Sequence, residues 1–198
     1  MYYLNKSINF FLNELKSKKP VPGGGSVASL SATLACGLLI MVSVFSQPKK
    51  KTKKSLKAIE RKVTSYLERL KKITEEDISS FKAFSKVIKA KKKDNKRVKK
   101  ALLKTLKPPL ATLRTTPLLM LEAKKLIKLS KRNIISDVAV AASLILASFE
   151  AAKVNVKINL KYLSDARLAS KIGKEMARIE KKIKMEKKSI LKGVYKVL

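Results

Sequence analysis

Carboxylates are the side chains through which this chain could carry out proton-transfer chemistry. The sequence contains no histidine and a single cysteine, so it lacks the usual imidazole base and cannot build a cysteine-rich metal site. Any reaction must use carboxylates, lysines, hydroxyls, amides or backbone groups. Among 14 acidic residues in a chain with 47 lysines and arginines, Asp137 and Asp77 stand out by their positions. We predict no metal site.

Asp137 is the only acidic residue between Glu122 and Glu150, and it stands at the entrance to an apolar stretch, next to Ser136 and shortly after Asn133. One interpretation makes Asp137 a catalytic carboxylate. The other makes Asp137 or Ser136 a helix cap, since short polar side chains commonly accept hydrogen bonds from the first backbone N–H groups of a helix. One residue could do both.

Asp77 lies with Glu75 in a small acidic cluster, one helical turn before Phe81 and two before Phe84. In a chain dominated by lysine, this position suggests a second functional carboxylate. The alternative is an ordinary solvated patch that pairs with neighbouring lysines, because exposed ion pairs are common on helices.

Three glycines and a serine, Gly23, Gly24, Gly25 and Ser26, follow a Pro-Val-Pro and open an uncharged segment. Free backbone N–H groups at a helix start favour an anion or an electron-rich ligand edge, and missing side chains allow close approach. The alternative is a tight turn with no ligand.

Two amides, Asn155 and Asn159, lie four residues apart and therefore on one face of a predicted helix. They could hydrogen-bond a ligand. Equally, they could satisfy each other or a helix end.

The elements that must position these residues are predicted to be helices. Glycine and proline number only six each, tryptophan is absent, and Ala, Leu, Ile, Lys and Ser dominate, which is a helix-forming composition. We expect one all-α domain over residues 1–198. A helix start is expected at KPPL, since proline is tolerated in a first turn. The predicted helices span residues 4–15, 26–46, 49–93, 109–129 and 165–197, and a further buried helix is expected to begin with VAVAASLILASFEAA at residue 138.

The uncharged segment at residues 26–46 is long enough, at 21 residues, to cross a bilayer, and lysines flank it. Its first half is small and partly polar, which suits a close contact between helices better than lipid. Small residues recur four apart at Ala28, Ala32 and Cys36, and again at Ser143, Ala147 and Ala151. We therefore expect two buried small-residue helices at the centre of a soluble bundle or dimer and no membrane span, with the transmembrane interpretation as the alternative.

The formal net charge of +33 predicts non-specific binding to polyanions at low salt. Lysine rather than arginine supplies most of this charge, and no aromatic platform for bases stands out, so sequence-specific nucleic-acid recognition is disfavoured. The alternative function is a non-catalytic basic scaffold that binds nucleic acid or an acidic membrane. The N-terminal residues do not read as a signal peptide, and we expect a cytoplasmic location.

Three stretches, PVPGGGSVASLSATLACGLLIMVSVFS, EEDISSFKAFSKVIKA and NIISDVAVAASLILASFEAAKVNVKINLKYLSD, together resemble the cyclodeaminase/cyclohydrolase family. This family comprises the C-terminal domain of formiminotransferase-cyclodeaminase and the stand-alone methenyltetrahydrofolate cyclohydrolases. The resemblance implies an all-helical homodimer that acts on one-carbon tetrahydrofolates without a metal or bound cofactor. The chain departs from the family pattern at Ser130-Lys131, at Glu75 to Ile78 and at Ala90.

The reactions implied by the resemblance need a proton acceptor and a negative group beside a cationic carbon. Asp137 is the first candidate for this carboxylate and Asp77 the second. The remaining candidates would bind substrate: Gly23, Gly24, Gly25, Ser26, Glu75, Asn133, Ser136, Asn155 and Asn159. Cyclohydrolase and cyclodeaminase activities are not separated by these residues, although the lack of a formiminotransferase domain slightly favours the cyclohydrolase.

Overall fold

The computed structural model describes residues 2–46, 50–90 and 94–198 of the chain. Within these ranges the protein is entirely helical, with no strand, as the composition predicted. The elements in order are η1 (Tyr3–Asn5), α1 (Ile8–Leu15), α2 (Gly24–Phe45), α3 (Lys50–Lys89), α4 (Asn95–Leu126), η2 (Arg132–Ile134), α5 (Ser136–Leu163) and α6 (Ala166–Tyr195).

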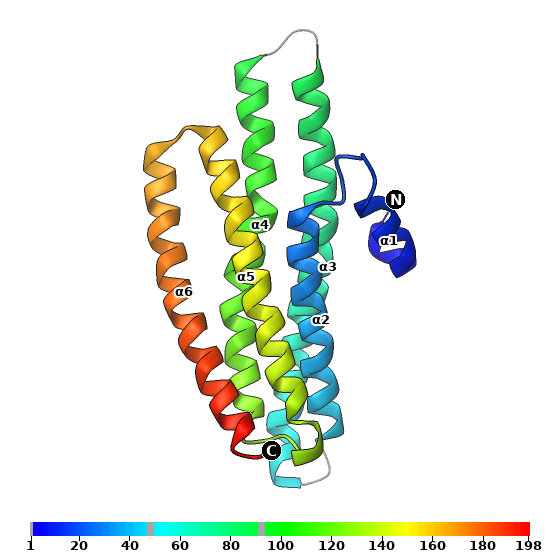
Figure 1. The fold of residues 1–198 in the computed structure, drawn as a ribbon, viewed down its shortest axis with the longest axis vertical. Helices are drawn as coiled ribbons and strands as arrows, with labels where there is room; N and C mark the ends of the chain where they lie inside the picture. Colours follow the sequence, from blue (N-terminus) through cyan, green and yellow to red (C-terminus); the bar gives the residue numbers. More distant parts are fainter. Residues whose placement is uncertain (1, 47–49, 91–93) are drawn as a thin grey trace.

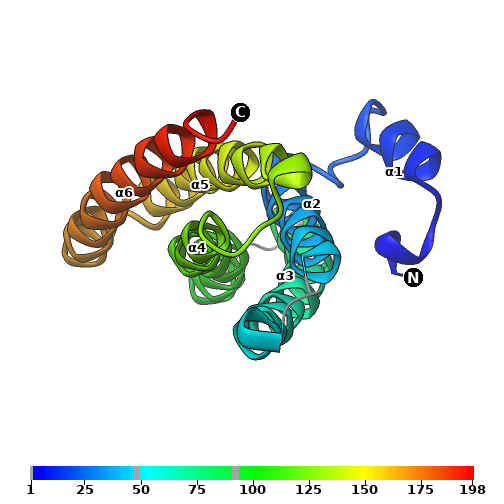
Figure 2. The ribbon, with the colours of Figure 1, turned by 90° about the horizontal axis from the view of Figure 1, so that it is seen from below.

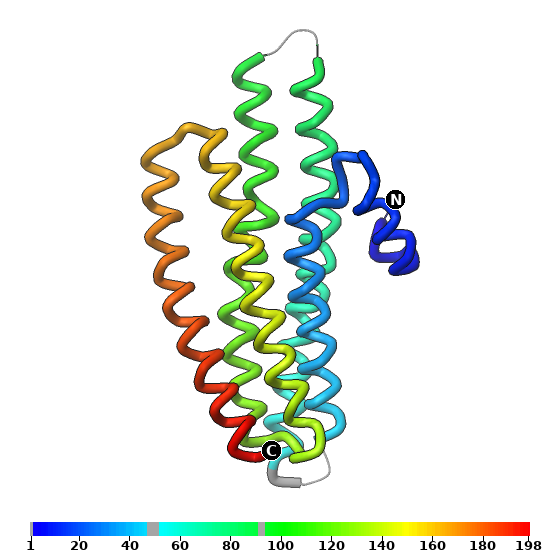
Figure 3. Tube along the Cα trace, in the orientation of Figure 1, coloured from blue at the N-terminus to red at the C-terminus, as the bar shows by residue number. Residues whose placement is uncertain are grey.

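The five long helices run alternately down and up, from α2 to α6, so that sequence neighbours are antiparallel (Figures 1 and 3). Helix α2 packs against α3 and α5, and α4 packs against α3 and α5 from the other side. Helix α6 lies outside α4 and α5 (Figure 2). Because α2 and α5 are antiparallel, the start of α2 meets the last turns of α5 at one end of the bundle.

The small residues of α2 form the predicted close contact. Ala28, Ala32 and Cys36 are completely buried, and the Ser148 hydroxyl of α5 donates to the Ala28 carbonyl at 2.6 Å. Burial raises the pKa of the Cys36 thiol to about 12. The small residues predicted for α5 do not lie at the centre of the single-chain bundle, since Ser143 and Ala151 are half-buried and Ala147 is exposed, and their role in a dimer contact stays a prediction. The buried face of α5 consists instead of Val138, Ala141, Ala142, Ile145, Ser148, Phe149, Ala152, Val156, Leu160 and Leu163.

Helix α4 is longer than predicted, because it begins at Asn95 and runs through Pro108, Pro109 and Pro117. The expected start at KPPL is therefore wrong. Asp94 caps the helix by accepting from the Lys96 backbone N–H at 2.8 Å. Proline removes the donor to the carbonyl four residues earlier, and side chains replace some of these donors. The Thr116 hydroxyl donates to the Leu113 carbonyl, which Pro117 leaves free, at 2.8 Å.

The N-terminal segment lies outside the bundle, against the upper part of α3 (Figures 1 and 2). Only part of its apolar stripe is covered: Phe11 is buried, whereas Ile8 is 78% exposed and Leu12 is 50% exposed. One contact that holds this segment against α3 is the Lys82 ammonium, which lies 4.9 Å from the centre of the Tyr3 ring. The segment thus adds a small satellite cluster to the main core.

Two helical stretches, Gly24–Phe45 and Arg132–Leu163, are long and apolar enough to cross a membrane. Within the single chain, 44% and 39% of their most apolar windows are buried. Both helices therefore bury one side in the bundle and leave an apolar outer face.

Candidate functional site

A cavity of about 280 Å³ opens at the end of the bundle where α2 begins. The loop before α2, the first residues of α2, and side chains from α3, α4 and α5 form its wall. The lining residues are Pro20, Val21, Gly23, Gly24, Gly25, Asp77, Phe81, Thr105, Pro109, Asn155, Ile158 and Asn159. Several of these were predicted as site residues, while the sequence patterns did not single out Thr105, Pro109 or Ile158. Asp77 is the one charged residue among the described residues of this wall.

The Asp77 carboxylate of α3 lies directly against the first turn of α2. The Ser26 hydroxyl donates to Asp77 Oδ2 at 2.8 Å. A methyl group at Gly25 would overlap this carboxylate, since its carbon would stand 2.7 Å from Asp77 Cγ. Glycine at position 25 is therefore required by close approach, and the glycine run fits α2 around a carboxylate supplied by α3.

The environment of Asp77 changes its acidity. Burial raises the pKa of the Asp77 carboxyl above its ordinary value, while hydrogen bonds from the Ser26 side chain and backbone lower it in part. A carboxylate with a raised pKa is a stronger base than an exposed one. The alternative prediction is an exposed ion pair between Asp77 and a neighbouring lysine. Two of these lysines have other partners, since Lys71 pairs with Glu68 and Lys82 lies over the Tyr3 ring.

One turn deeper, a second contact sets the register between α2 and α3. The hydroxyls of Ser29 and Thr74 lie 2.8 Å apart, and both residues are fully buried. The Thr74 hydroxyl also bonds the Leu70 carbonyl at 3.0 Å. A buried polar pair of this kind is satisfied only in one register, so it holds Gly25 opposite Asp77.

The two asparagines of α5 face the cavity with their amide nitrogens already engaged. Asn155 Nδ2 donates to the Ala151 carbonyl at 2.9 Å, and Asn159 Nδ2 donates to the Thr105 carbonyl at 3.0 Å. The Thr105 carbonyl is available because Pro109, four residues later, has no N–H. Neither amide oxygen accepts a hydrogen bond from the part of the chain that the structure describes.

The side chains of the cavity wall therefore offer acceptors, one carboxylate and two amide oxygens, beside the backbone N–H groups of the first turn of α2. Such a wall suits a ligand that carries N–H donors or a positive centre. It also places a base beside that ligand, which is the requirement for removing a proton from water or an amine.

Four predicted site residues lie elsewhere. Glu75 accepts the Leu4 backbone N–H at 2.8 Å and so holds the N-terminal segment rather than the cavity. Asn133 and Ser136 are exposed near the start of α5, and Asp137 is half-buried in its first turn.

The start of α5 is also not capped as expected, because the capping position is Ile135 and no side chain accepts there. Asp137 and Asn155 are separated by 18 residues of one helix, or roughly 27 Å. Within one chain, the two candidate carboxylates Asp137 and Asp77 cannot belong to the same site.

Among the described residues, no group of three or more cysteine, aspartate, glutamate or histidine residues is arranged to hold a metal ion. The expectation of a site without metal or bound cofactor stays a prediction.

Comparison with known proteins agrees with this geometry. The family model described as formiminotransferase-cyclodeaminase matches residues 7–178. The methenyltetrahydrofolate cyclohydrolase of Methylorubrum extorquens is 28% identical over 182 residues, which cover 87% of this chain and 88% of that protein.

Among solved structures, the crystal structure of formiminotetrahydrofolate cyclodeaminase from Thermotoga maritima matches with a TM-score of 0.82. It is 28% identical, and the match covers 98% of this chain and 96% of that one. Since the family model spans most of the sequence and a solved relative shares the whole fold, the chain belongs to the formiminotransferase-cyclodeaminase family, as its motifs predicted.

Proposed function

We propose that this protein is a one-carbon tetrahydrofolate enzyme, a 5,10-methenyltetrahydrofolate cyclohydrolase, a 5-formiminotetrahydrofolate cyclodeaminase, or both, and that the cavity at the start of α2 is its active site. The proposal is supported by the names of the two relatives, one of each activity. The observation that carries it is the Asp77 carboxylate, held against the glycine-started helix in a cavity that is otherwise uncharged over its described wall.

In cyclohydrolysis, water attacks the cationic methenyl carbon, the bond from that carbon to N5 breaks, and 10-formyltetrahydrofolate forms with release of one proton. Asp77 would accept the proton of the attacking water. Its negative charge would also stabilise the cationic methenyl group beside it.

In cyclodeamination, N10 attacks the carbon of the protonated formimino group, the N10 proton leaves, and ammonia departs to give the cationic methenyl product. Asp77 would take the N10 proton and return it to the leaving nitrogen. Both reactions need the same group at the same carbon, so one carboxylate suffices for either.

The amide oxygens of Asn155 and Asn159 would bind N–H groups on the pterin edge. The free backbone N–H groups at Gly24 and Gly25 would face an electron-rich edge or a carboxylate of the substrate. These assignments follow from the unoccupied hydrogen-bonding groups in the cavity wall.

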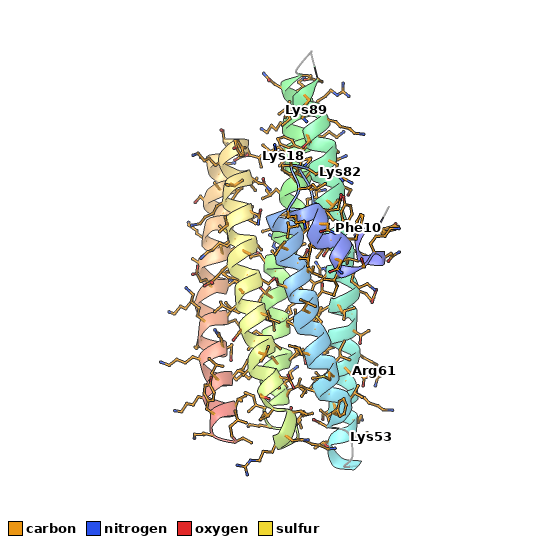
Figure 4. All side chains as sticks on the ribbon, turned by 45° about the vertical axis from the view of Figure 1, so that its right-hand side comes forward. Phe10, Lys18, Lys53, Arg61, Lys82 and Lys89 are labelled. Carbon is orange, nitrogen blue, oxygen red and sulfur yellow. The ribbon has the colours of Figure 1, made fainter. Side chains whose placement is uncertain are left out.

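The positive surface would attract the anionic substrate over longer distances. Figure 4 shows Lys53, Arg61 and Lys89 projecting from the outer side of α3. With a formal net charge of +33, the chain is expected to draw in carboxylates and to bind polyanions non-specifically at low salt.

A homodimer in the cytosol is the assembly that we propose. The outer faces of α2 and α5 are apolar and uncovered in one chain. Their exposed residues include Leu34 (56%), Phe45 (62%), Val140 (50%), Val154 (58%), Ile158 (52%) and Tyr162 (70%). A second copy would cover these apolar residues, and this would account for two helices that are long and apolar enough to cross a membrane.

The dimer is tested by measuring mass in solution without detergent. Leu34→Glu should shift the protein to monomers, whereas Ile8→Glu, at an exposed apolar residue of α1, should not. A protein that sediments with membranes and needs detergent would overturn the proposal.

The function is tested by following 5,10-methenyltetrahydrofolate absorbance and, separately, ammonia release from 5-formiminotetrahydrofolate. Wild-type protein should accelerate at least one reaction, and Asp77→Asn should abolish the acceleration. If neither reaction is catalysed and the protein instead binds nucleic acid with a steep salt dependence, the basic-scaffold alternative replaces the enzyme.

A further inference from the structure

A cavity larger than the one that contains Asp77 lies elsewhere among the described residues. It is a groove between α4 and α6 with a volume of about 470 Å³. Its floor is apolar and consists of Leu103, Leu106, Leu110, Leu168 and Ile172. Leu106 and Ile172 are nearly buried, at 5% and 3%, whereas Leu103 remains 37% exposed. The groove is thus a formed hollow with open apolar surface.

The rim of this groove is strongly basic. Lys100, Lys104, Lys107, Arg114 and Lys171 line it, against the single acid Glu175. Arg114 and Glu175 neutralise each other in a two-pronged pair, with Nε and Nη2 donating at 2.7 and 2.8 Å. Lys171 also lies close enough to Glu175 to help lower its pKa, after the larger effect of Arg114.

Three lysines of α4 therefore remain without an acidic partner among the residues that the structure describes: Lys100, Lys104 and Lys107. They lie three and four residues apart on one face of α4, where like charges repel. An anion seated beside them would relieve this repulsion. The apolar floor beneath them would accept a hydrocarbon body.

The groove is separate from the Asp77 cavity, although the same turns of α4 border both. Thr105 and Pro109 face the Asp77 cavity, while Leu106 and Leu110 face the groove. Its size is within the range of sites for small molecules, roughly 300–1,000 Å³.

We propose that the groove between α4 and α6 is a binding site for a small amphipathic anion, with an apolar chain on the leucine floor and one carboxylate or phosphate head at Lys100, Lys104 and Lys107. This site is independent of the proposed folate chemistry. It requires both parts of the ligand, since the leucine and isoleucine floor supplies no charge and the lysine ammonium groups attract only the anionic head.

The test is calorimetric titration at moderate salt with dodecanoate and dodecyl phosphate below their micelle concentrations. We expect saturable binding of one molecule per chain for at least one of them, and the better of the two identifies the head group. Dodecanol, which lacks the charge, and triglutamate, which lacks the apolar chain, should bind at least about tenfold more weakly.

Matched charge reversals locate the site. Lys104→Glu combined with Lys107→Glu should weaken binding about tenfold or more, because two of the three head-group lysines become repulsive. Lys181→Glu combined with Lys188→Glu makes the same change in net charge at exposed positions of α6 outside the groove and should leave binding nearly unchanged. Leu103→Asp, at a partly exposed floor residue, should also remove binding, whereas Asp77→Asn should not.

Three results would overturn the proposal. They are equal binding of dodecanol, equal competition by triglutamate, and equal weakening by the two double variants. Equal binding of dodecanol would mean that the ligand binds to an apolar patch without help from the lysines. Equal competition by triglutamate, or equal weakening by the two double variants, would mean that the anion is attracted by the overall positive charge and not by this groove. Melting curves of each variant confirm that lost binding is not lost folding.

Discussion

Helix α2 begins with two glycines and a serine, and helix α5 begins with a serine and an aspartate. The surroundings of these two helix starts differ. At the start of α2, a carboxylate from another helix is held by Ser26 and enclosed in a cavity. At the start of α5, Asp137 belongs to the helix itself, no side chain caps the turn, and Ser136 is exposed. The comparison shows that two similar helix starts acquire different surroundings from the helices that pack against them.

Helix α3, which packs against the start of α2, supplies the carboxylate that the first turn of α2 lacks. The α2 start carries no charge of its own, and burial against it raises the pKa of the Asp77 carboxyl. Removing solvent from an acidic group makes it a better base, and this requires two elements in contact.

The two helix starts are compared most directly by neutralising the carboxylate at each one, Asp77 at the start of α2 and Asp137 at the start of α5. Asp77→Asn should lower turnover by about 10²-fold or more, which is the usual contribution of a general base. Asp137→Asn should change turnover little. The measurement is the absorbance or ammonia assay on both variants at equal concentration. A larger loss in Asp137→Asn would instead show that Asp137 serves a site completed by a second chain.

The same variant has an opposite effect on stability. Because the pKa of Asp77 is raised in the folded state, the folded protein holds a proton that the unfolded chain has released. The free energy of unfolding therefore falls as the pH rises through the raised pKa of Asp77 in the folded protein. Asp77→Asn should melt at the same or a higher temperature than wild type at pH 7, and a clearly lower melting temperature would mean that the charge stabilises the fold.

The glycine run offers the next comparison within one turn. Gly25→Ala would push a methyl group into the Asp77 carboxylate, whereas Gly23→Ala meets nothing within 4 Å. Since displacement of a catalytic group by a fraction of an ångström is costly, Gly25→Ala should lose on the order of ten- to a hundredfold in turnover. Gly23→Ala should retain activity, and both proteins should fold. Equal activities would remove the close-approach role from Gly25.

Much of this arrangement could be predicted from the sequence, for identifiable reasons. Composition and spacing predicted an all-helical chain, the α2 start at the glycines, and Asn155 and Asn159 on one helix face. These features depend on local propensity and periodicity, which the sequence contains directly.

Other features depend on contacts that the sequence does not show. The expected helix start at KPPL is wrong because α4 continues through these prolines, and the Asn159 side chain bonds the Thr105 carbonyl that Pro109 leaves free. Asp137 and Asn155 occupy one helix, but only the antiparallel packing of α2 and α5 decides which end of α5 meets the glycines. Neighbouring motifs along a sequence can therefore lie at opposite ends of a bundle.

The serines at the two helix starts give a smaller, pH-dependent contrast. Ser26→Ala removes a hydrogen bond that lowers the pKa of Asp77, so this pKa should rise further. Activity that needs ionised Asp77 would then be lost at a higher pH than in the wild type as the solution is acidified. Ser136→Ala should leave the pH–rate profile unchanged. An unshifted profile in Ser26→Ala would mean that Asp77 is not the titrating base.

The smallest expected effect separates the two asparagines by stability. Asn159→Ala leaves the Thr105 carbonyl without a donor, because Pro109 cannot supply one, and should lower the free energy of unfolding by about 1 kcal/mol. Asn155→Ala should cost less, since the Ala151 carbonyl keeps the backbone donor that the helix provides. Urea denaturation of both variants measures this difference. Equal losses would mean that the Thr105 carbonyl finds another hydrogen-bond donor when Asn159 is removed. The missing N–H of Pro109 would then not explain why the Asn159 amide nitrogen points to α4 and its oxygen to the cavity.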